Sequence, residues 1–139
     1  MQEKALELLK LYRLRNTAMR RQVLELFLKA GHKALSSSNL ESALEKTDRI
    51  TLYRTLKTFE RNGIIHQAID GSGVTKYALC HGQCSEHDHM DDHPHFHCKD
   101  CGKTICMEGK IKNNVKVPKG FIVQQKHFIL EGTCSDCSN

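Results

Sequence analysis

Cysteine and histidine residues are concentrated between Cys80 and Cys106. This stretch holds five of the chain's seven cysteines and six of its nine histidines. Thiolate and imidazole ligands together suit zinc best among the common divalent ions, with other late transition metals behind it. The residue types and their density therefore predict a metal-binding protein.

Two Cys-x-x-Cys pairs stand out among these residues, one at 98–101 and one at 134–137. Each pair turns two thiolates toward one ion, and two pairs supply a closed tetrahedral site. Such a site has no open position, so its role is structural, and its binding free energy of roughly 10 kcal/mol or more becomes folding free energy. The alternative is buried or redox-active cysteines, but a thioredoxin-type pair would begin a helix after a strand, and neither pair does. We predict a structural zinc held by Cys98, Cys101, Cys134 and Cys137.

The first half of the chain carries the pattern of a helical unit. Apolar spacing predicts a helix over residues 2–12 and a second helix that begins at the N-cap Thr17 and ends at Gly31. The serines at 36–38 with Glu41 form a capping-box signature for a third helix. Thr47 or Asp48 caps a fourth helix, which ends at residues 62–63.

Two β-type runs, 64–69 and 74–79, follow around a glycine-rich turn and predict a hairpin. Three helices followed by a hairpin is the order of a winged helix-turn-helix, in which the last helix enters the DNA major groove and the hairpin forms the wing. Shorter β-type runs recur from residue 96 onward, at 103–107, 121–124 and 127–131. We therefore predict an α+β chain.

Charge is distributed unevenly between the halves. Residues 1–69 carry 13 Lys and Arg against 7 Asp and Glu, whereas residues 70–139 carry 8 against 9. A basic first half suggests a polyanionic partner, although a solvated basic surface explains the charge equally well.

Other features point to an intracellular chain. No apolar run approaches the roughly 20 residues that a membrane span requires, and the charged start of the chain does not resemble a signal peptide. An odd cysteine count clustered with histidines favours reduced thiols. We expect a cytoplasmic protein with no membrane contact.

Five motifs together resemble the ferric uptake regulator family of bacterial metal-dependent repressors. They are LRNTAMR at 14–20, TLYRTL at 51–56, FERNGI at 59–64, HPHFHCKDCG at 93–102 and GTCSDC at 132–137. The resemblance implies a winged-helix DNA-binding domain (1–80), a hinge with an inserted loop (81–92) and a small α/β dimerisation domain (93–139). It also implies a homodimer that binds operator DNA when a sensing site holds metal.

The resemblance also suggests which residues contact DNA. It makes Tyr53 and Arg54 the base-facing residues of the recognition helix and Arg15 a minor-groove or backbone contact. Arginine can contact guanine with two hydrogen bonds, and a tyrosine ring can pack on a thymine methyl group. Arg20 and Lys57, like Arg49, are expected to contact phosphate. The alternative for Tyr53 is a core aromatic.

The sensing site is expected to follow the zinc uptake regulator branch. Iron sensors of the family use a histidine before the third helix and a glutamate ending the wing, but Ala34 and Ala78 occupy those positions here, with His32 displaced nearby. Zinc sensors use an acidic residue after the recognition helix, for which a histidine stands here, a wing-end cysteine and two histidines before the first cysteine pair. The corresponding residues are His66, Cys80, His93 and His95. Alternate strand positions would present the last two on one face. We predict zinc at the regulatory site, with iron(II) or peroxide sensing as the alternative.

The remaining histidines and cysteines each have more than one interpretation. His127 matches a family ligand of a further site, together with His97, Glu108 or Asp92, or else it is a hydrogen-bonded strand histidine. Cys84, His87 and His89 lie in an inserted loop that supplies substitute ligands, a third site or only solvated side chains. Cys106 is interpreted as a small buried residue. A zinc enzyme would need a general base, and Glu86 is the only nearby candidate, without any enzyme motif. We therefore expect a regulator and no enzyme.

Overall fold

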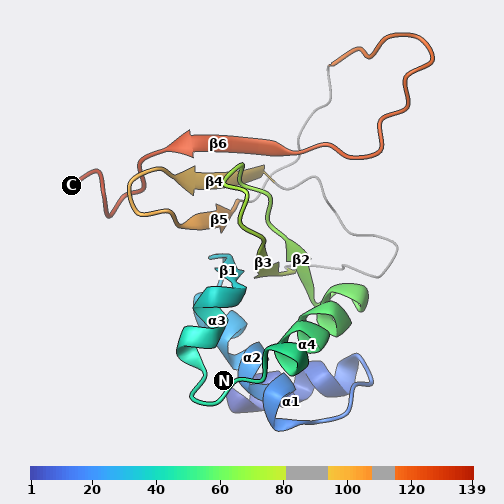
Figure 1. Ribbon diagram of the computed structural model, residues 1–139, viewed down its shortest axis with the longest axis vertical. Helices are drawn as coiled ribbons and strands as arrows, with labels where there is room; N and C mark the ends of the chain where they lie inside the picture. The colour runs from blue at the N-terminus through green and yellow to red at the C-terminus, as the bar shows by residue number, and fades with distance from the viewer. Residues whose placement is uncertain (81–93, 108–114) are drawn as a thin grey trace.

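The computed structural model describes residues 1–80, 94–107 and 115–139. The predictions made for residues 81–93 and 108–114, including those for His93, Glu108 and the inserted loop, fall outside this part of the chain. Helices dominate the first half, and the described residues form two three-stranded sheets, the first of which includes a short strand between the second and third helices (Figure 1). The predicted α+β class, with a winged-helix unit first, is confirmed.

The four predicted helices are present. They are α1 (Gln2–Leu11), α2 (Ala18–Ala30), α3 (Ser37–Ala43) and α4 (Arg49–Arg61). Thr17 caps α2 by accepting a hydrogen bond from the Arg20 amide, and Gly31 ends that helix with a φ of 63°. Asp48 caps α4 by accepting from the Ile50 amide.

The capping box of α3 differs from the prediction. The Ser36 hydroxyl accepts a hydrogen bond from the Asn39 amide, and Asn39 Oδ1 accepts one from the Ser36 amide at 2.9 Å. The reciprocal partner in the box is therefore Asn39 and not Glu41, because the N-cap is Ser36 and the residue three positions later is Asn39. The helix begins earlier than the Ser38 cap would allow.

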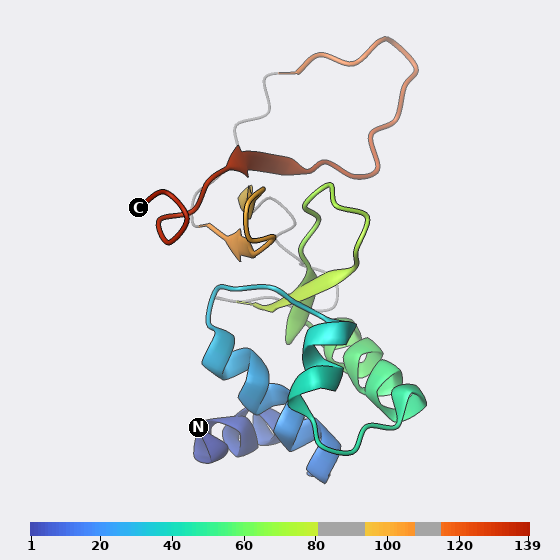
Figure 2. The ribbon, with the colours of Figure 1, turned by 60° about the vertical axis from the view of Figure 1, so that its left-hand side comes forward.

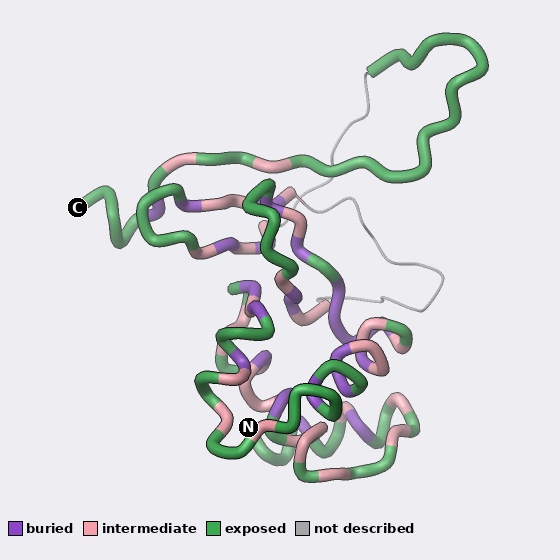
Figure 3. The backbone as a smooth tube through the Cα atoms, in the orientation of Figure 1, coloured by how far each residue is buried: buried purple, intermediate pink, exposed green. Residues whose placement is uncertain are grey.

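The helical half has its own hydrophobic core. Leu9, Leu24, Phe27, Leu56 and Phe59 are almost completely buried where α1, α2 and α4 meet. Figure 3 shows the buried residues on the inner sides of these helices. Burial of a large aliphatic or aromatic side chain is worth about 1.5–3 kcal/mol, so this half holds together by ordinary apolar packing.

The predicted hairpin is confirmed and gains a third strand. Strands β2 (Ile65–Gln67) and β3 (Lys76–Leu79) pair antiparallel, and β1 (Leu35–Ser36) pairs with the other side of β3. Gly71 and Gly73, both at positive φ, allow the turn between β2 and β3. We call β2, β3 and the turn between them the wing.

The second sheet has the order β5-β4-β6. Strand β4 (Pro94–Cys98) pairs antiparallel with β5 (Thr104–Cys106) and parallel with β6 (Phe128–Gly132). The strand predicted at 121–124 is wrong: these residues have no regular structure, and Phe121 and Ile122 are exposed. A strand needs a neighbour for its backbone groups, and within the described residues this segment pairs with none.

The segment that leads into β1 contacts the second sheet through backbone hydrogen bonds. The Ala34 amide donates to the Thr104 carbonyl at 2.8 Å, and the Cys106 amide donates to the His32 carbonyl at 2.9 Å. The turn of the wing also lies against the second sheet, as Figures 1 and 2 both show. The helical half and the second sheet are thus joined at β5 and at the wing.

No helix in the described part of the chain is long and apolar enough to cross a membrane.

Candidate functional site

The four cysteines predicted to hold a structural metal come together at one end of the second sheet. Their sulfur atoms all lie within 4.8 Å of one another. Cys98 ends β4, Cys101 lies in the following turn, and Cys134 and Cys137 lie in the turn after β6. Parallel pairing of β4 with β6 brings the two turns together, since Cys98 is the register partner of Gly132.

The spacing of these sulfur atoms fits a tetrahedral ion. A Zn–S distance of about 2.3 Å gives a tetrahedron with S–S edges of about 3.8 Å. The sulfur atoms of Cys101 and Cys134 are 3.8 Å apart. The four-cysteine cluster therefore has the donor set and the dimensions to hold a structural metal.

The protonation of this cluster also favours a cation. Backbone N–H groups of Cys101 and Cys134 point at the Cys98 sulfur and lower its pKa to about 6. Hydrogen bonding to Cys134, together with burial, raises the pKa of Cys137 to about 12. Without a cation the clustered thiols cannot all ionise, and a divalent ion removes this opposition.

A second cluster lies between the wing and the second sheet. One ring nitrogen each of His66 and His95 and the Cys106 sulfur all lie within 4.8 Å of one another, and all three residues are buried. His66 is on β2, whereas His95 and Cys106 are directly opposite each other on β4 and β5. We call these three residues the interdomain cluster.

Distances in the interdomain cluster also suit a metal. His66 Nε2 is 3.3 Å from Cys106 Sγ, close to the roughly 3.5 Å edge that Zn–N and Zn–S distances give a tetrahedron. The rings of His66 and His95 are 6.0 Å apart between centroids. Burial raises the pKa of the Cys106 thiol to about 11, so a metal must displace its proton on binding.

Cys80, predicted as a ligand, lies at the opposite edge of the His66 ring. Its sulfur is 3.2 Å from His66 Nδ1, while Nε2 faces Cys106. A sulfur that accepts a hydrogen bond from Nδ1 would leave the Nε2 lone pair available for a metal. His93, the fourth predicted ligand, falls outside the described residues.

Cys106 is the member of the interdomain cluster that the sequence interpretation did not name as a candidate ligand. It is buried, as expected, but it packs with Ala34, Ala68 and Ala78. Two of these alanines stand at the positions where iron sensors would carry ligands, so small side chains leave room for the sulfur. The available signal was the spacing of Thr104 and Cys106, which puts both on one face of a strand.

The structure does not bring together His97 and His127, which were predicted to share a further metal site. His97 Nδ1 lies 3.0 Å from Thr104 Oγ1 and 3.4 Å from Asp70 Oδ2, between the wing and β5. His127 is exposed just before β6. Glu108 falls outside the described residues, so this pairing stays a prediction.

The predicted DNA-binding residues lie on the helical half. Tyr53 on α4 is 60% exposed, which excludes the alternative of a core aromatic, and Arg54 beside it is exposed too. Lys57 lies over the Tyr53 ring, with Nζ 5.4 Å from its centroid. Arg20 donates to the Arg15 carbonyl at 3.0 Å, which fixes the segment before α2. These side chains offer cations and one aromatic ring on the solvent side of the helices.

Comparison with known proteins agrees with this arrangement. Residues 12–130 match the model of the ferric uptake regulator family. The ferric uptake regulation protein of Bordetella parapertussis is 28% identical over 132 residues, covering 89% of each chain. That of Campylobacter jejuni is 34% identical over 93 residues, covering 64% of this chain and 54% of its own.

Solved structures share the fold. A zinc uptake regulator complexed with zinc and DNA superposes with a TM-score of 0.62 at 19% identity, covering 99% of this chain and 92% of its own. The Helicobacter pylori ferric uptake regulator, described with three functional metal-binding sites, gives 0.60 at 18% identity, covering 100% and 95%. The chain therefore belongs to the ferric uptake regulator family, whose members are metal-responsive, DNA-binding transcription regulators and not enzymes.

Proposed function

We propose that this protein is a zinc-responsive repressor that binds operator DNA as a homodimer when the interdomain cluster holds metal. In this proposal residues 1–80 bind DNA, residues 93–139 form the dimer, and the four-cysteine cluster holds a structural zinc. The protein would act in the cytoplasm, where its operator lies.

The observation that carries the proposal is the origin of the clustered ligands. His66 belongs to the wing, and His95 and Cys106 belong to the second sheet. A metal can bind all three only when the two halves are held together. Binding therefore selects one arrangement of the helical half over others, as a switch requires. His93 remains the predicted fourth ligand, and Cys80 orients His66 from its other edge.

Ligand chemistry favours zinc over iron(II). The cluster supplies two imidazoles and one thiolate, and no carboxylate belongs to it among the described residues. Thiolate and imidazole suit zinc, whereas oxygen-rich sites suit harder ions. Iron(II) is the second candidate, because the relatives with the highest sequence similarity named above are ferric uptake regulation proteins.

The helical half would supply DNA recognition through α4. Tyr53 and Arg54 are exposed on this helix and are proposed to face base edges, while Arg15, Arg20 and Lys57 would contact phosphate. The structurally similar zinc uptake regulator is described in complex with zinc and DNA.

Exposed apolar residues support the homodimer. Phe128 and Leu130 of β6 are 42% and 46% exposed, and Phe121 and Ile122 on the preceding segment are more exposed still. Strand β6 is also an edge of its sheet. An apolar edge of this kind is suited to a second copy of the chain.

Operator binding in buffered metal tests the function. The wild type should bind its operator at free Zn(II) concentrations that saturate a second metal site per chain. Fe(II) should not replace Zn(II) in this assay. Cys106→Ser should abolish the Zn(II) response, because a ligand is lost. Cys80→Ser should weaken it by about 10–100-fold, the usual effect of losing a group that orients a ligand. A Cys106→Ser protein with an unchanged Zn(II) response would refute the site, and a response to Fe(II) alone would refute zinc sensing.

A further inference from the structure

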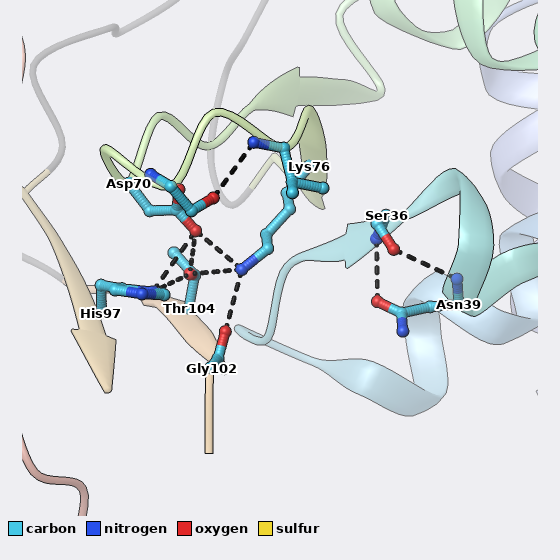
Figure 4. A network of polar contacts seen from close by, with 9 residues as sticks. Ser36, Asn39, Asp70, Lys76, His97, Gly102 and Thr104 are labelled. Atoms are coloured by element: carbon cyan, nitrogen blue, oxygen red, sulfur yellow. Dashed lines mark hydrogen bonds and ion pairs between the residues drawn. The ribbon is translucent and has the colours of Figure 1, made fainter. Parts of the chain in front are cut away.

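A buried polar network joins the wing to the second sheet, apart from the interdomain cluster (Figure 4). The Asp70 side chain, only 1% exposed, lies in the turn of the wing, and its Oδ2 is 2.7 Å from Lys76 Nζ at the start of β3. Lys76 also donates across to the Gly102 carbonyl at 2.9 Å and to Thr104 Oγ1 at 3.1 Å. The Thr104 hydroxyl donates back to Asp70 Oδ2 at 2.5 Å.

His97 completes the network from β4. Its Nδ1 is within 3.4 Å of both Thr104 Oγ1 and Asp70 Oδ2. Burial alone would raise the pKa of Asp70, but hydrogen bonds from Lys76, Ser72 and Thr104 outweigh it and hold the pKa well below its usual range. Asp70 is therefore an almost fully buried carboxylate, whose Oδ2 accepts from Lys76 and Thr104 and whose Oδ1 accepts from the Ser72 amide.

The residues of the second sheet that contact Asp70 and Lys76 lie close in sequence to the first cysteine pair of the four-cysteine cluster. Gly102 directly follows Cys101, His97 directly precedes Cys98, and Thr104 begins β5. The wing itself does not need the network, since its strands are already held by backbone pairing. A buried ion pair is costly to desolvate. Because this pair also contacts the second sheet, its role is to join the wing to that sheet.

We propose that Asp70, Lys76, Thr104 and His97 form a latch that holds the wing against the second sheet before the sensing metal binds. None of the four belongs to the interdomain cluster. They would nevertheless set how tightly that cluster binds metal, because its ligands come from both halves. This effect on metal affinity rests on the proposed function, whereas the effect on the arrangement of the halves does not.

The size of the effect follows from the closed population. Apparent affinity falls in proportion to the fraction of molecules in the binding-competent arrangement. If loss of the latch leaves about one molecule in ten closed, the dissociation constant for the second metal rises about tenfold. The affinity of the structural site should not change, since all its ligands lie on one side of the latch.

Three latch variants and one control test the proposal on full-length protein carrying its structural metal. Asp70→Asn keeps the side-chain shape and removes the charge, and Lys76→Met removes the ammonium group. The double variant Asp70→Leu/Lys76→Met leaves no charge buried and provides the comparison if a single variant does not fold. The control is Glu41→Gln, which breaks the exposed ion pair with Arg49, 3.5 Å long and confined to the helical half.

Two measurements separate the latch from the switch. Small-angle scattering and hydrogen exchange on protein without the second metal should show a larger radius of gyration and faster exchange in the wing of each latch variant. Chelator competition should then show about tenfold weaker binding of the second Zn(II), with Glu41→Gln like wild type. Structural metal content should stay at the wild-type level.

The outcomes distinguish the latch, its effect on metal affinity and the proposed function. Latch variants with wild-type scattering and wing exchange would overturn the latch, whatever the metal response. Open halves with unchanged Zn(II) affinity would overturn its effect on metal binding. A wild type that binds no second metal would overturn the proposed function, while the scattering result would still support or refute the latch.

Discussion

Removal of the structural metal should disorder the second sheet and leave the helical half folded. In the described part of that sheet and its turns, no Leu, Ile, Val or Phe is buried; the buried residues are His95, Cys98, Thr104, Cys106 and Cys134. The helical half, by contrast, buries a full set of large apolar side chains. A metal in the four-cysteine cluster would therefore supply the stability that an apolar core supplies in the helical half.

The magnitude follows from comparing two free energies. A structural zinc contributes roughly 10 kcal/mol or more to folding. The total unfolding free energy of a small domain is about 5–15 kcal/mol. Loss of the ion thus removes an amount comparable to the whole stability of a domain, which the backbone pairing of three short strands cannot replace.

Cys134→Ser is the sharpest perturbation, because it removes the sulfur of one of the two buried residues of the four-cysteine cluster. Hydrogen exchange by mass spectrometry should show rapid exchange in β4 and β6 and continued protection in α2 and α4. Circular dichroism should keep most of the helical signal. Cys106→Ser, in the same sheet but outside the four-cysteine cluster, is the matched control and should retain protection in β4 and β6.

Two results would refute this reasoning. Full protection of β4 and β6 in Cys134→Ser protein with no bound metal would mean that the sheet is stable by itself. Simultaneous loss of protection in α2 and α4 would mean that the helical half has no independent core.

Three further predictions concern the proposed recognition helix α4, a helix cap and pH. Arg54→Ala should cost about 1–3 kcal/mol in operator binding and relax the sequence preference, whereas Lys57→Ala should weaken binding to all DNA sequences alike and reduce the slope of log affinity against log salt by about 1. Filter binding on operator and scrambled DNA distinguishes the two variants. Identical binding profiles would contradict the assigned roles. Thr17→Ala should lower the free energy of unfolding by about 1 kcal/mol through loss of the α2 cap, measured by urea denaturation, and a change below the error of that method would count against the cap. The Asp70 pKa is lowered in the folded state, so its contribution to stability is fully present above the ordinary value of 3.8 and is lost progressively as the pH falls from there toward the lowered pKa. The difference in melting temperature between the wild type and Asp70→Asn should therefore begin to shrink below about pH 4. A difference that stays constant as the pH falls further would argue against an ionised Asp70.

Local patterns were sufficient to predict most of the fold. Helix positions followed from apolar spacing and from single caps such as Thr17 and Asp48, whose hydrogen bonds reach only two or three residues along the chain. The wing followed from two β-type runs around glycines, and the four-cysteine cluster from two turns that each present two thiolates. These features depend on neighbours in sequence.

Tertiary structure decided what depends on neighbours in space. Nothing near Cys106 in the sequence shows that it lies opposite His95 and in contact with His66, so its place in the interdomain cluster appeared only in the fold. His97 was expected at a metal site, yet it meets Asp70 and Thr104 because the wing turns onto the second sheet. The run at 121–124 has strand composition but no strand, since pairing requires a partner that composition cannot supply. The sequence thus determined the ligand types and the local turns that present them, and the packing of one half against the other determined which ligands meet.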